Sequence, residues 1–198
     1  MTTTEKISEL DELELQILEL KKKRAELRQK LTPEKVADHV LIDHDNKAVK
    51  LSELFGDKKD LLVIHNMGTQ CPYCTLWADG LDGQWQYISD RAAAVVVSAD
   101  SVETQKAFKA KRGWSFPMLS GEKSEFIKAM GFEGEDHPDY GKFKPGVSAF
   151  RKNEDGSIVR ISKAPFGPGD DFCAVWPLFD LLQDGHADWQ PKFNLKKN

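Results

Sequence analysis

The chain has 198 residues, of which 40% are apolar and 30% charged, and its formal net charge is −4 at pH 7. This composition is ordinary for a soluble globular protein, and the length suffices for one full domain with an appendage. The small negative charge gives no electrostatic reason for nucleic acid or an anionic membrane surface to be the main partner.

The apolar stretches, the N-terminal residues and the cysteines indicate the cellular compartment in which we expect the protein. No apolar stretch reaches the roughly 18 residues that a bilayer-spanning helix needs. The N-terminus, residues 1–6, has no apolar signal core, so we expect a cytoplasmic protein without a membrane partner. Three cysteines do not make a disulfide scaffold, but two of them have C-x-x-C spacing, which in a reducing compartment indicates metal binding or redox chemistry.

Residues 5–31 are predicted to form one long helix, because no glycine or proline occurs before Pro33. Apolar side chains recur at heptad spacing, with an interruption at Arg24, and about three heptads of this kind are near the limit for a coiled coil. Leu15 and Leu18 lie off this seam and form a second apolar face. Two roles stay open, a homodimer through residues 5–31 or a helix folded back on its own domain. The seam consists of Leu10, Leu13, Ile17, Leu20, Leu27 and Leu31.

After Pro33, short strands and helices alternate. A hairpin over residues 36–51 comes first. Continuous apolar runs at 61–64 and 92–97 are typical of strands buried on both faces. Residues 116–119 are interpreted as a short edge strand and 132–144 as a loop. The remaining predicted elements are helices at 74–88, 102–111 and 124–130, a strand pair at 147–150 and 158–161 with an Asp-Gly turn, and a closing helix at 174–183.

This order predicts an α/β fold, because buried strands that alternate with helices form a mostly parallel sheet covered by helices on both faces. We divide the chain into an N-terminal helical arm, residues 1–33, and an α/β domain, residues 34–198.

Cys71 and Cys74 lie where a buried strand ends and a helix begins. A helix N-terminus carries unpaired N–H groups and about half a positive charge, so a thiolate placed there is stabilised and its pKa falls. The second cysteine lies one turn along, close enough to attack a mixed disulfide. We therefore assign Cys71 as the nucleophile and Cys74 as the resolving thiol.

The succession strand, C-x-x-C, helix, then β-α and a final ββα resembles the thioredoxin superfamily over roughly residues 36–184. The resemblance implies a thioredoxin-like central mixed sheet flanked by helices, here with a long N-terminal helix in addition. In that superfamily a cis-proline opens the strand that faces the cysteine pair, and Pro145 precedes Gly146 here. The resemblance thus implies that Pro145 is cis and lies against both sulfurs, and that Pro72, Tyr73, Pro145 and Gly146 contact the substrate.

The stretch from Cys71 to Asp79, of the form CPxC-x-x-WAD, is similar to one branch in particular. That branch is an uncharacterised family of bacterial thioredoxin-like proteins with a helical N-terminal extension. Because its activity is not established, this likeness implies nothing further about the substrate.

Several departures from better-known branches limit what can be carried over. The Cys-Pro-Tyr-Cys tetrad occurs in many glutaredoxins, but their Gly-Gly glutathione segment is absent. Gln70 stands where thioredoxins usually have tryptophan. Peroxiredoxins place threonine or serine three residues before the attacking cysteine and a proline further upstream, whereas this chain has Gly68 and Ile64. A peroxidase of the usual design is therefore not expected.

The preferred function is a dithiol–disulfide oxidoreductase that exchanges disulfides with a protein or a small thiol. It requires a dithiol electron donor or glutathione and no tightly bound cofactor. The alternatives are a non-catalytic interaction module that dimerises through its N-terminal helix, and an atypical thiol peroxidase. A metal site is disfavoured, because a closed zinc site needs four ligands and the chain has one C-x-x-C.

Four further residues have a structural and a functional interpretation. His65 at a strand end and Trp77 on the helix are interpreted first as core residues, and otherwise as neighbours of the site. Asp79 is a candidate proton acceptor for Cys74, the role of a carboxylate in this superfamily. Cys173 near the last helix is a packing residue or a third redox thiol.

Overall fold

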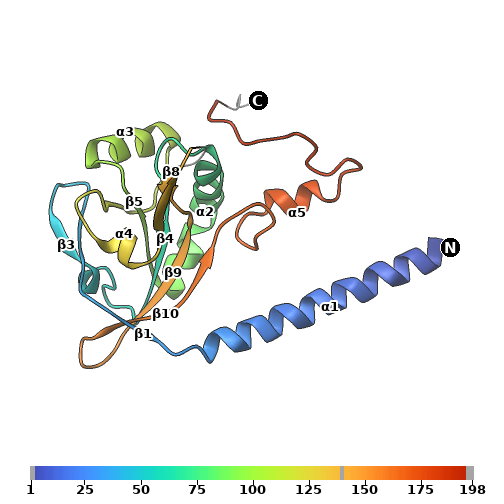
Figure 1. Ribbon diagram of the computed structural model, residues 1–198, viewed down its shortest axis with the longest axis horizontal. Helices are drawn as coiled ribbons and strands as arrows, with labels where there is room; N and C mark the ends of the chain where they lie inside the picture. The colour runs from blue at the N-terminus through green and yellow to red at the C-terminus, as the bar shows by residue number, and fades with distance from the viewer. Residues whose placement is uncertain (1–2, 139–140, 195–198) are drawn as a thin grey trace.

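The computed structural model describes residues 3–138 and 141–194 (Figure 1). Its centre is an eight-stranded mixed sheet with the strand order β1-β10-β9-β4-β5-β6-β2-β3. This mixed sheet with flanking helices and a long N-terminal helix confirms the predicted thioredoxin-like α/β class. The outer limits of the two expected units, residues 1–33 and 34–198, lie outside the described residues.

The first helix, α1, spans Thr3–Gln29 as a single unbroken element, as its sequence predicts. In Figure 1 it projects away from the sheet, and its first turns lie far from the α/β domain. Its tie to the domain is ionic, since Lys21 and Arg24 both pair with the carboxylate of Asp171. The chain then enters β1, Glu34–Val36, which was not predicted as a separate strand and pairs antiparallel with β10.

The predicted hairpin is confirmed as β2, Val40–Ile42, and β3, Ala48–Lys50. Asp43 holds its turn together, because the carboxylate accepts the N–H groups of Asp45 and Lys47 at 2.8 and 2.9 Å. Asn46 adopts a left-handed conformation with φ of 60°, which asparagine tolerates better than most residues. A short 3-10 helix, η1, follows at Leu51–Glu53.

Two apolar runs form the centre of the sheet as predicted. They are β4, Asp60–His65, and β5, Ala93–Ser98, and they pair in parallel. The strand β6, Met118–Ser120, pairs in parallel with β5. It is not the edge strand that its shortness suggested, because Ile42 of β2 pairs with Ser120 on its outer side. The N-terminal hairpin thereby covers this side of the sheet.

Helices α2, Pro72–Arg91, and α3, Val102–Arg112, cross between these strands. Ser101 caps α3 through its hydroxyl and Gly113 ends it with φ of 76°, which are the usual residue types at these two positions. The glycines at 80 and 83 do not divide α2, which runs unbroken for 20 residues. The short helix α4, Phe126–Ala129, lies within the predicted range 124–130.

Alternate residues of β4 face opposite sides of the sheet, as the pleat requires. Leu61 and Val63 pack into a core with Phe126 and Phe150. Ile64 belongs to a second core on the other face, where the aromatic side chains of α2 lie. The central strands are therefore buried on both sides, which explains why they appear as uninterrupted apolar runs.

The closing strand pair is confirmed and longer than expected, with β9 at Gly146–Lys152 and β10 at Ile158–Pro165. β9 runs antiparallel to both β4 and β10. The predicted loop over 132–144 is partly wrong, because β7, Glu133–His137, and β8, Gly141–Phe143, form a small antiparallel sheet. The sequence of this segment did not indicate strands, because β7 and β8 are largely exposed and therefore consist mostly of glycines and charged residues. Residues 139 and 140 of that loop lie outside the described residues.

The last helix, α5, spans only Val175–Phe179 and is shorter than the predicted 174–183. The chain after α5 folds back on this helix, since the Trp189 ring contacts Trp176 and Phe179 at 5.8 and 4.9 Å between centroids. In the described ranges, none of the helices combines the length and apolar character that crossing a bilayer would require.

Candidate active site

Cys71 is the N-cap residue of α2, at the end of the loop that follows β4. Its sulfur accepts the backbone N–H of Cys74 at 3.1 Å, the role that a serine or aspartate oxygen usually plays at this position. Pro72 occupies the first helical position, where its missing N–H costs nothing. The sequence Cys-Pro thus starts the helix and directs a partly buried sulfur to its positive end.

The pKa of the Cys71 thiol is lowered from 9.0 to about 7. The largest cause is the hydrogen bond from the Cys74 side chain, followed by the backbone N–H groups of Cys74 and Tyr73, while partial burial opposes the shift. Hydrogen bonds that stabilise the thiolate therefore outweigh its desolvation. At neutral pH a large share of Cys71 is in the nucleophilic form.

The pKa of Cys74 is shifted in the opposite direction to that of Cys71. Its side chain is 4% exposed, and its pKa is raised well above 9.0 by its hydrogen bond to Cys71, by burial and by the charge of the Cys71 thiolate. The Met67 N–H points at its sulfur from 3.4 Å. One turn of helix thus holds a thiolate and a protonated thiol in hydrogen-bond contact, the arrangement of an attacking and a resolving cysteine.

We expect the alkylation rate of Cys71 to rise with pH and to reach half its maximum near pH 7, since only the thiolate reacts. The measurement is iodoacetamide labelling between pH 5 and 10, with Cys71 followed by peptide mass spectrometry. The Cys74→Ala variant should shift the midpoint upward, because it removes the side-chain hydrogen bond that lowers the pKa of Cys71 most. A midpoint near pH 8.5 in the wild type, the value of an ordinary thiol, would contradict the assignment.

The loop before Cys71 is fixed by Asp100, which follows β5. The Asp100 carboxylate accepts the Thr69 N–H at 2.9 Å, and burial raises its pKa. Gly68 has φ of 113°, and a Cβ there would lie 2.9 Å from Asp100 Oδ1. Only glycine fits this position, so the loop as built excludes the threonine or serine that peroxiredoxins carry there.

Pro145 lies on the same side of the sheet end as the resolving sulfur, because Pro145 and Cys74 line one cavity of about 10 Å³. Gly146 begins β9 and pairs with His65 of β4. The prediction of a cis Lys144–Pro145 bond is wrong, since no cis bond occurs in the described ranges. The bond is trans, the form that X-Pro bonds favour, and hydrogen bonds of 2.8 Å from Lys144 N–H to Phe132 and 3.1 Å from Phe166 N–H to Pro145 flank it.

A family model described as "Bacterial protein of unknown function (DUF899)" matches residues 5–197, almost the whole chain. The chain belongs to the DUF899 family. The match includes α1, so the helical arm is part of the family's pattern together with the thioredoxin-like domain.

Sequence relatives of this DUF899 protein carry redox names. A Mycobacterium tuberculosis H37Rv protein named "putative peroxiredoxin" is 33% identical over 134 residues, 66% of this chain and 83% of the relative. Peroxiredoxin bcp1 of Schizosaccharomyces pombe is 29% identical over 142 residues, 71% of each chain. Together with the poised thiol pair, these relatives make the DUF899 protein a thiol-based redox enzyme in general terms.

Solved structures confirm the fold. Reduced Prx3 of Vibrio vulnificus, in complex with hydrogen peroxide, is 16% identical with a TM-score of 0.56, covering 71% of this chain and 90% of that one. Peroxidoxin BcpB of Mycobacterium tuberculosis is 22% identical with a TM-score of 0.52, covering 68% and 84%. Likeness at this level of identity shows a shared architecture of the DUF899 domain and nothing about its substrate.

An aromatic cluster beside the cysteines was only partly predicted. Tyr73, on the first turn of α2, packs on Trp77 and Trp176 at about 6.3 and 6.2 Å between ring centroids. Trp77 is a buried core residue, and its indole N–H donates to the Asp170 carboxylate at 2.9 Å. The sequence did not predict the role of Asp170, because this residue lies 93 residues from Trp77 and no local sequence pattern indicates the contact.

Asp79 does not serve Cys74 as a proton acceptor. Its carboxylate pairs with the Arg112 guanidinium and accepts the Trp114 indole N–H at 2.7 Å. These contacts join α2 to the end of α3, which is a structural role.

His65 is a core residue on the face of the sheet opposite α2. Its ring stacks on Phe132 at 3.8 Å between centroids and shares a 3.0 Å hydrogen bond with the Ser148 hydroxyl. Burial, together with the charges of Arg160 and Lys163, lowers its pKa from 6.5 to about 3. The first interpretation of His65, as a structural residue, is the one that the geometry supports.

The neutral state of His65 predicts a pH-dependent stability. Below pH 6.5 the unfolded chain binds a proton that the folded chain does not bind until about pH 3, so stability falls as pH falls through this window. The loss should approach about 2 kcal/mol by pH 5. Urea unfolding at pH 7.5 and 5 measures it, and the variant H65F/S148A, which removes both hydrogen-bond partners, should show a smaller loss. Equal losses in both proteins would contradict the prediction.

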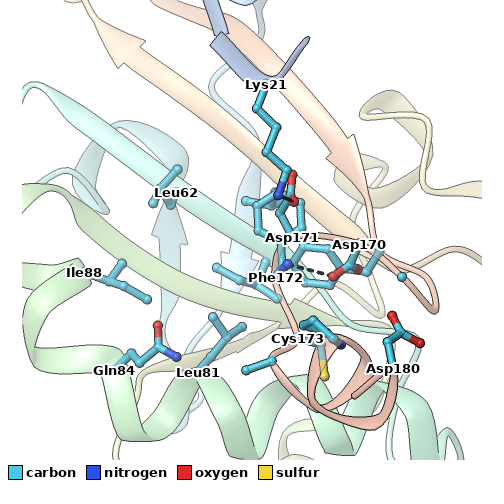
Figure 2. Close-up of a pocket in the computed structure, with 16 residues that line it drawn as sticks. Lys21, Leu62, Leu81, Gln84, Ile88, Asp170, Asp171, Phe172, Cys173 and Asp180 are labelled. Atoms are coloured by element: carbon cyan, nitrogen blue, oxygen red, sulfur yellow. Dashed lines mark hydrogen bonds and ion pairs between the residues drawn. The ribbon is translucent and has the colours of Figure 1, made fainter. Parts of the chain in front are cut away.

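A pocket of about 630 Å³ lies beside β4 and α2, and Cys71 is not among the residues that line it (Figure 2). Leu62 of β4 and Leu81 and Ile88 of α2 line one side, and the segment that contains Cys173 lines the other. Burial raises the pKa of the Cys173 thiol, so its buried sulfur is a packing group rather than a reactive thiolate. In the described part of the chain, no three histidine, cysteine or acidic side chains gather as a metal site would need.

Proposed function

We propose that this DUF899 protein is a dithiol–disulfide oxidoreductase with Cys71 as the attacking and Cys74 as the resolving thiol. The observation that carries the proposal is the opposite shift of the two pKa values, with Cys71 near 7 and Cys74 well above 9.0. One thiol is ready to attack while its partner is held protonated until it is needed.

The proposed reaction balances over two exchanges. The Cys71 thiolate attacks one sulfur of a substrate disulfide, forming a mixed disulfide and releasing the first substrate thiolate. Cys74 then loses its proton and attacks the Cys71 sulfur, which releases the second substrate thiolate and closes the Cys71–Cys74 bond. The substrate gains two electrons, and a dithiol donor returns them to the enzyme. No bound cofactor is required.

Burial of Cys74 suits this sequence of events. When Cys71 becomes part of a mixed disulfide, its negative charge disappears, and one of the causes that raise the pKa of Cys74 disappears with it. Formation of the intermediate therefore makes the resolving thiol easier to deprotonate.

A thiol peroxidase is the second candidate, and the names of the relatives favour it. In that reaction the Cys71 thiolate attacks a peroxide oxygen, an alcohol or water leaves, and Cys71 becomes a sulfenic acid. Cys74 then displaces water to form the same Cys71–Cys74 disulfide. The absence of a hydroxyl at Gly68 argues for disulfides as the better substrates, because the loop offers no side-chain donor there.

The disulfide oxidoreductase and the thiol peroxidase are distinguished by which oxidant reacts fastest with the reduced protein. The reduced protein is mixed without oxygen with hydrogen peroxide, cumene hydroperoxide, oxidised glutathione or a protein disulfide, and formation of the internal disulfide is followed by tryptophan fluorescence and intact mass. We expect a disulfide to react fastest, with Cys173→Ser behaving as the wild type.

Two other outcomes decide against the proposal. Peroxides that react orders of magnitude faster than any disulfide would establish the peroxidase. A protein that oxidises no faster than free cysteine with every oxidant would instead support the interaction module.

A further inference from the structure

The seam of α1 is left uncovered by the rest of the chain. Five of its apolar side chains are between 39% and 65% exposed, although they recur at the spacing that pairs helices in a coiled coil. A helix of this length that exposes such a stripe to water is poorly stabilised on its own. The exposed seam consists of Leu10, Leu13, Ile17, Leu20 and Leu27.

The domain of the same chain does not cover this seam. The helix is tied to it through the charged groups of Lys21 and Arg24 on Asp171, in the last third of α1. Figure 1 shows the N-terminal half extending past the domain. The occupant of the seam must therefore come from elsewhere.

The first half of α1 is mostly acidic and the second half mostly basic, and this division indicates which partner helix can bind the seam. Residues 5–19 contain six acidic side chains and one basic one, whereas residues 20–31 contain six basic side chains and one acidic one. A copy of the same helix running in the opposite direction places each acidic half beside a basic half. A parallel copy would place like charges together.

We propose that α1 pairs with α1 of a second copy of this chain as an antiparallel two-stranded coiled coil. The two-fold axis passes between residues 18 and 19, so that Leu10 packs on Leu27 of the second copy and Ile17 on Leu20. Such a contact uses the same surface of both copies and closes at two chains. The proposal does not depend on the proposed function.

The flanking positions agree with the antiparallel direction. Glu9 faces Lys30 of the second copy, which is an attractive contact, and Glu14 faces Lys21, whose ammonium group is also paired with Asp171 of its own chain. In a parallel pair Glu9 would instead face Glu14, and Lys23 would face Arg28. Arg24 interrupts the seam, and its guanidinium already binds Asp171, which leaves its alkyl stem free to pack on Leu13 of the second copy.

The first test changes the seam and measures the mass of the full-length protein in solution. We expect the wild type to sediment as a dimer at micromolar concentration and the variant L13E/L20E as a monomer. The matched control is L15E/L18E, which adds the same two charges at exposed leucines off the seam and should remain dimeric. A monomeric wild type, or equal dissociation of both variants, would overturn the proposal.

The second test uses charge to determine direction. In the antiparallel pair, Glu9→Lys or Lys30→Glu alone creates like-charge contacts and should weaken the dimer several-fold, while E9K/K30E restores opposite charges and dimer affinity. In a parallel pair Glu9→Lys would face Glu14 and strengthen the dimer. Strengthening by E9K, or no rescue by the double variant, contradicts the antiparallel direction.

A distance measurement checks the register directly. A spin label on Ser8→Cys, in a chain whose three native cysteines are serines, should lie about 30 Å from its copy along an antiparallel pair. In a parallel pair the two labels would lie within about 20 Å. The shorter distance, in a dimer whose circular dichroism matches the wild type, would refute the proposed register.

Discussion

Replacing Cys71 with serine is expected to lower the rate of disulfide reduction on the order of 10³-fold or more, to the uncatalysed level. A serine hydroxyl is not ionised at neutral pH, so the hydrogen bonds that stabilise the Cys71 thiolate have no anion to act on. The rate is measured as reduction of a test disulfide with a dithiol donor in excess.

Cys74→Ser should behave differently from Cys71→Ser. The attacking thiolate remains, so this variant forms a mixed disulfide and stops there, covalently bound to its substrate. The trapped species are identified by mass spectrometry, and Cys71→Ser/Cys74→Ser should trap nothing. Cys173→Ser is the matched control with full turnover. If Cys71→Ser kept activity while Cys173→Ser lost it, the centre would lie at Cys173 instead.

Gly146→Ala is expected to destabilise the protein by about 3 kcal/mol or more, at the upper end of the cost of overpacking. A Cβ at this position would lie 2.5 Å from both the Ala164 carbonyl oxygen and the Phe132 ring. The carbonyl belongs to the paired strand β10 and cannot turn aside. Thermal unfolding should therefore show a midpoint lower by roughly 6–12 °C.

A second glycine provides the control. Gly80→Ala places its Cβ in open space within α2, so the gain in helix propensity should stabilise the protein by about 1 kcal/mol. If both substitutions lowered the midpoint equally, crowding at β9 would not be the cause.

Elements dictated by local pattern could be predicted from the sequence. The long helix α1, the buried strands β4 and β5 and the capped helix α3 each depend on residues close together in the chain. The placement of Cys71 at a strand end and helix start follows from the same kind of pattern. Its hydrogen bond from the Cys74 N–H is what a cap residue at that position makes.

What the sequence could not predict depends on distant partners. The position of β6 inside the sheet results from its pairing with β2, about 78 residues earlier. The resemblance to thioredoxins implied a cis Pro145, but the Lys144–Pro145 bond of this chain is trans. Asp79 was a candidate proton acceptor by sequence, but its partners are Arg112 at the end of α3 and Trp114 two residues further on.

The three residues of β1 have a consequence for any shortened form of the protein. They cover part of β10, an eight-residue strand that would otherwise be the rim of the sheet, and Glu34 neutralises the buried guanidinium of Arg160. A truncation that ends before Glu34 keeps β1 paired with β10. A truncation past Val36 removes β1, and the exposed edge of β10 can then pair with strands of other molecules, which promotes aggregation. Solubility should thus change abruptly across a few residues that look like a simple linker.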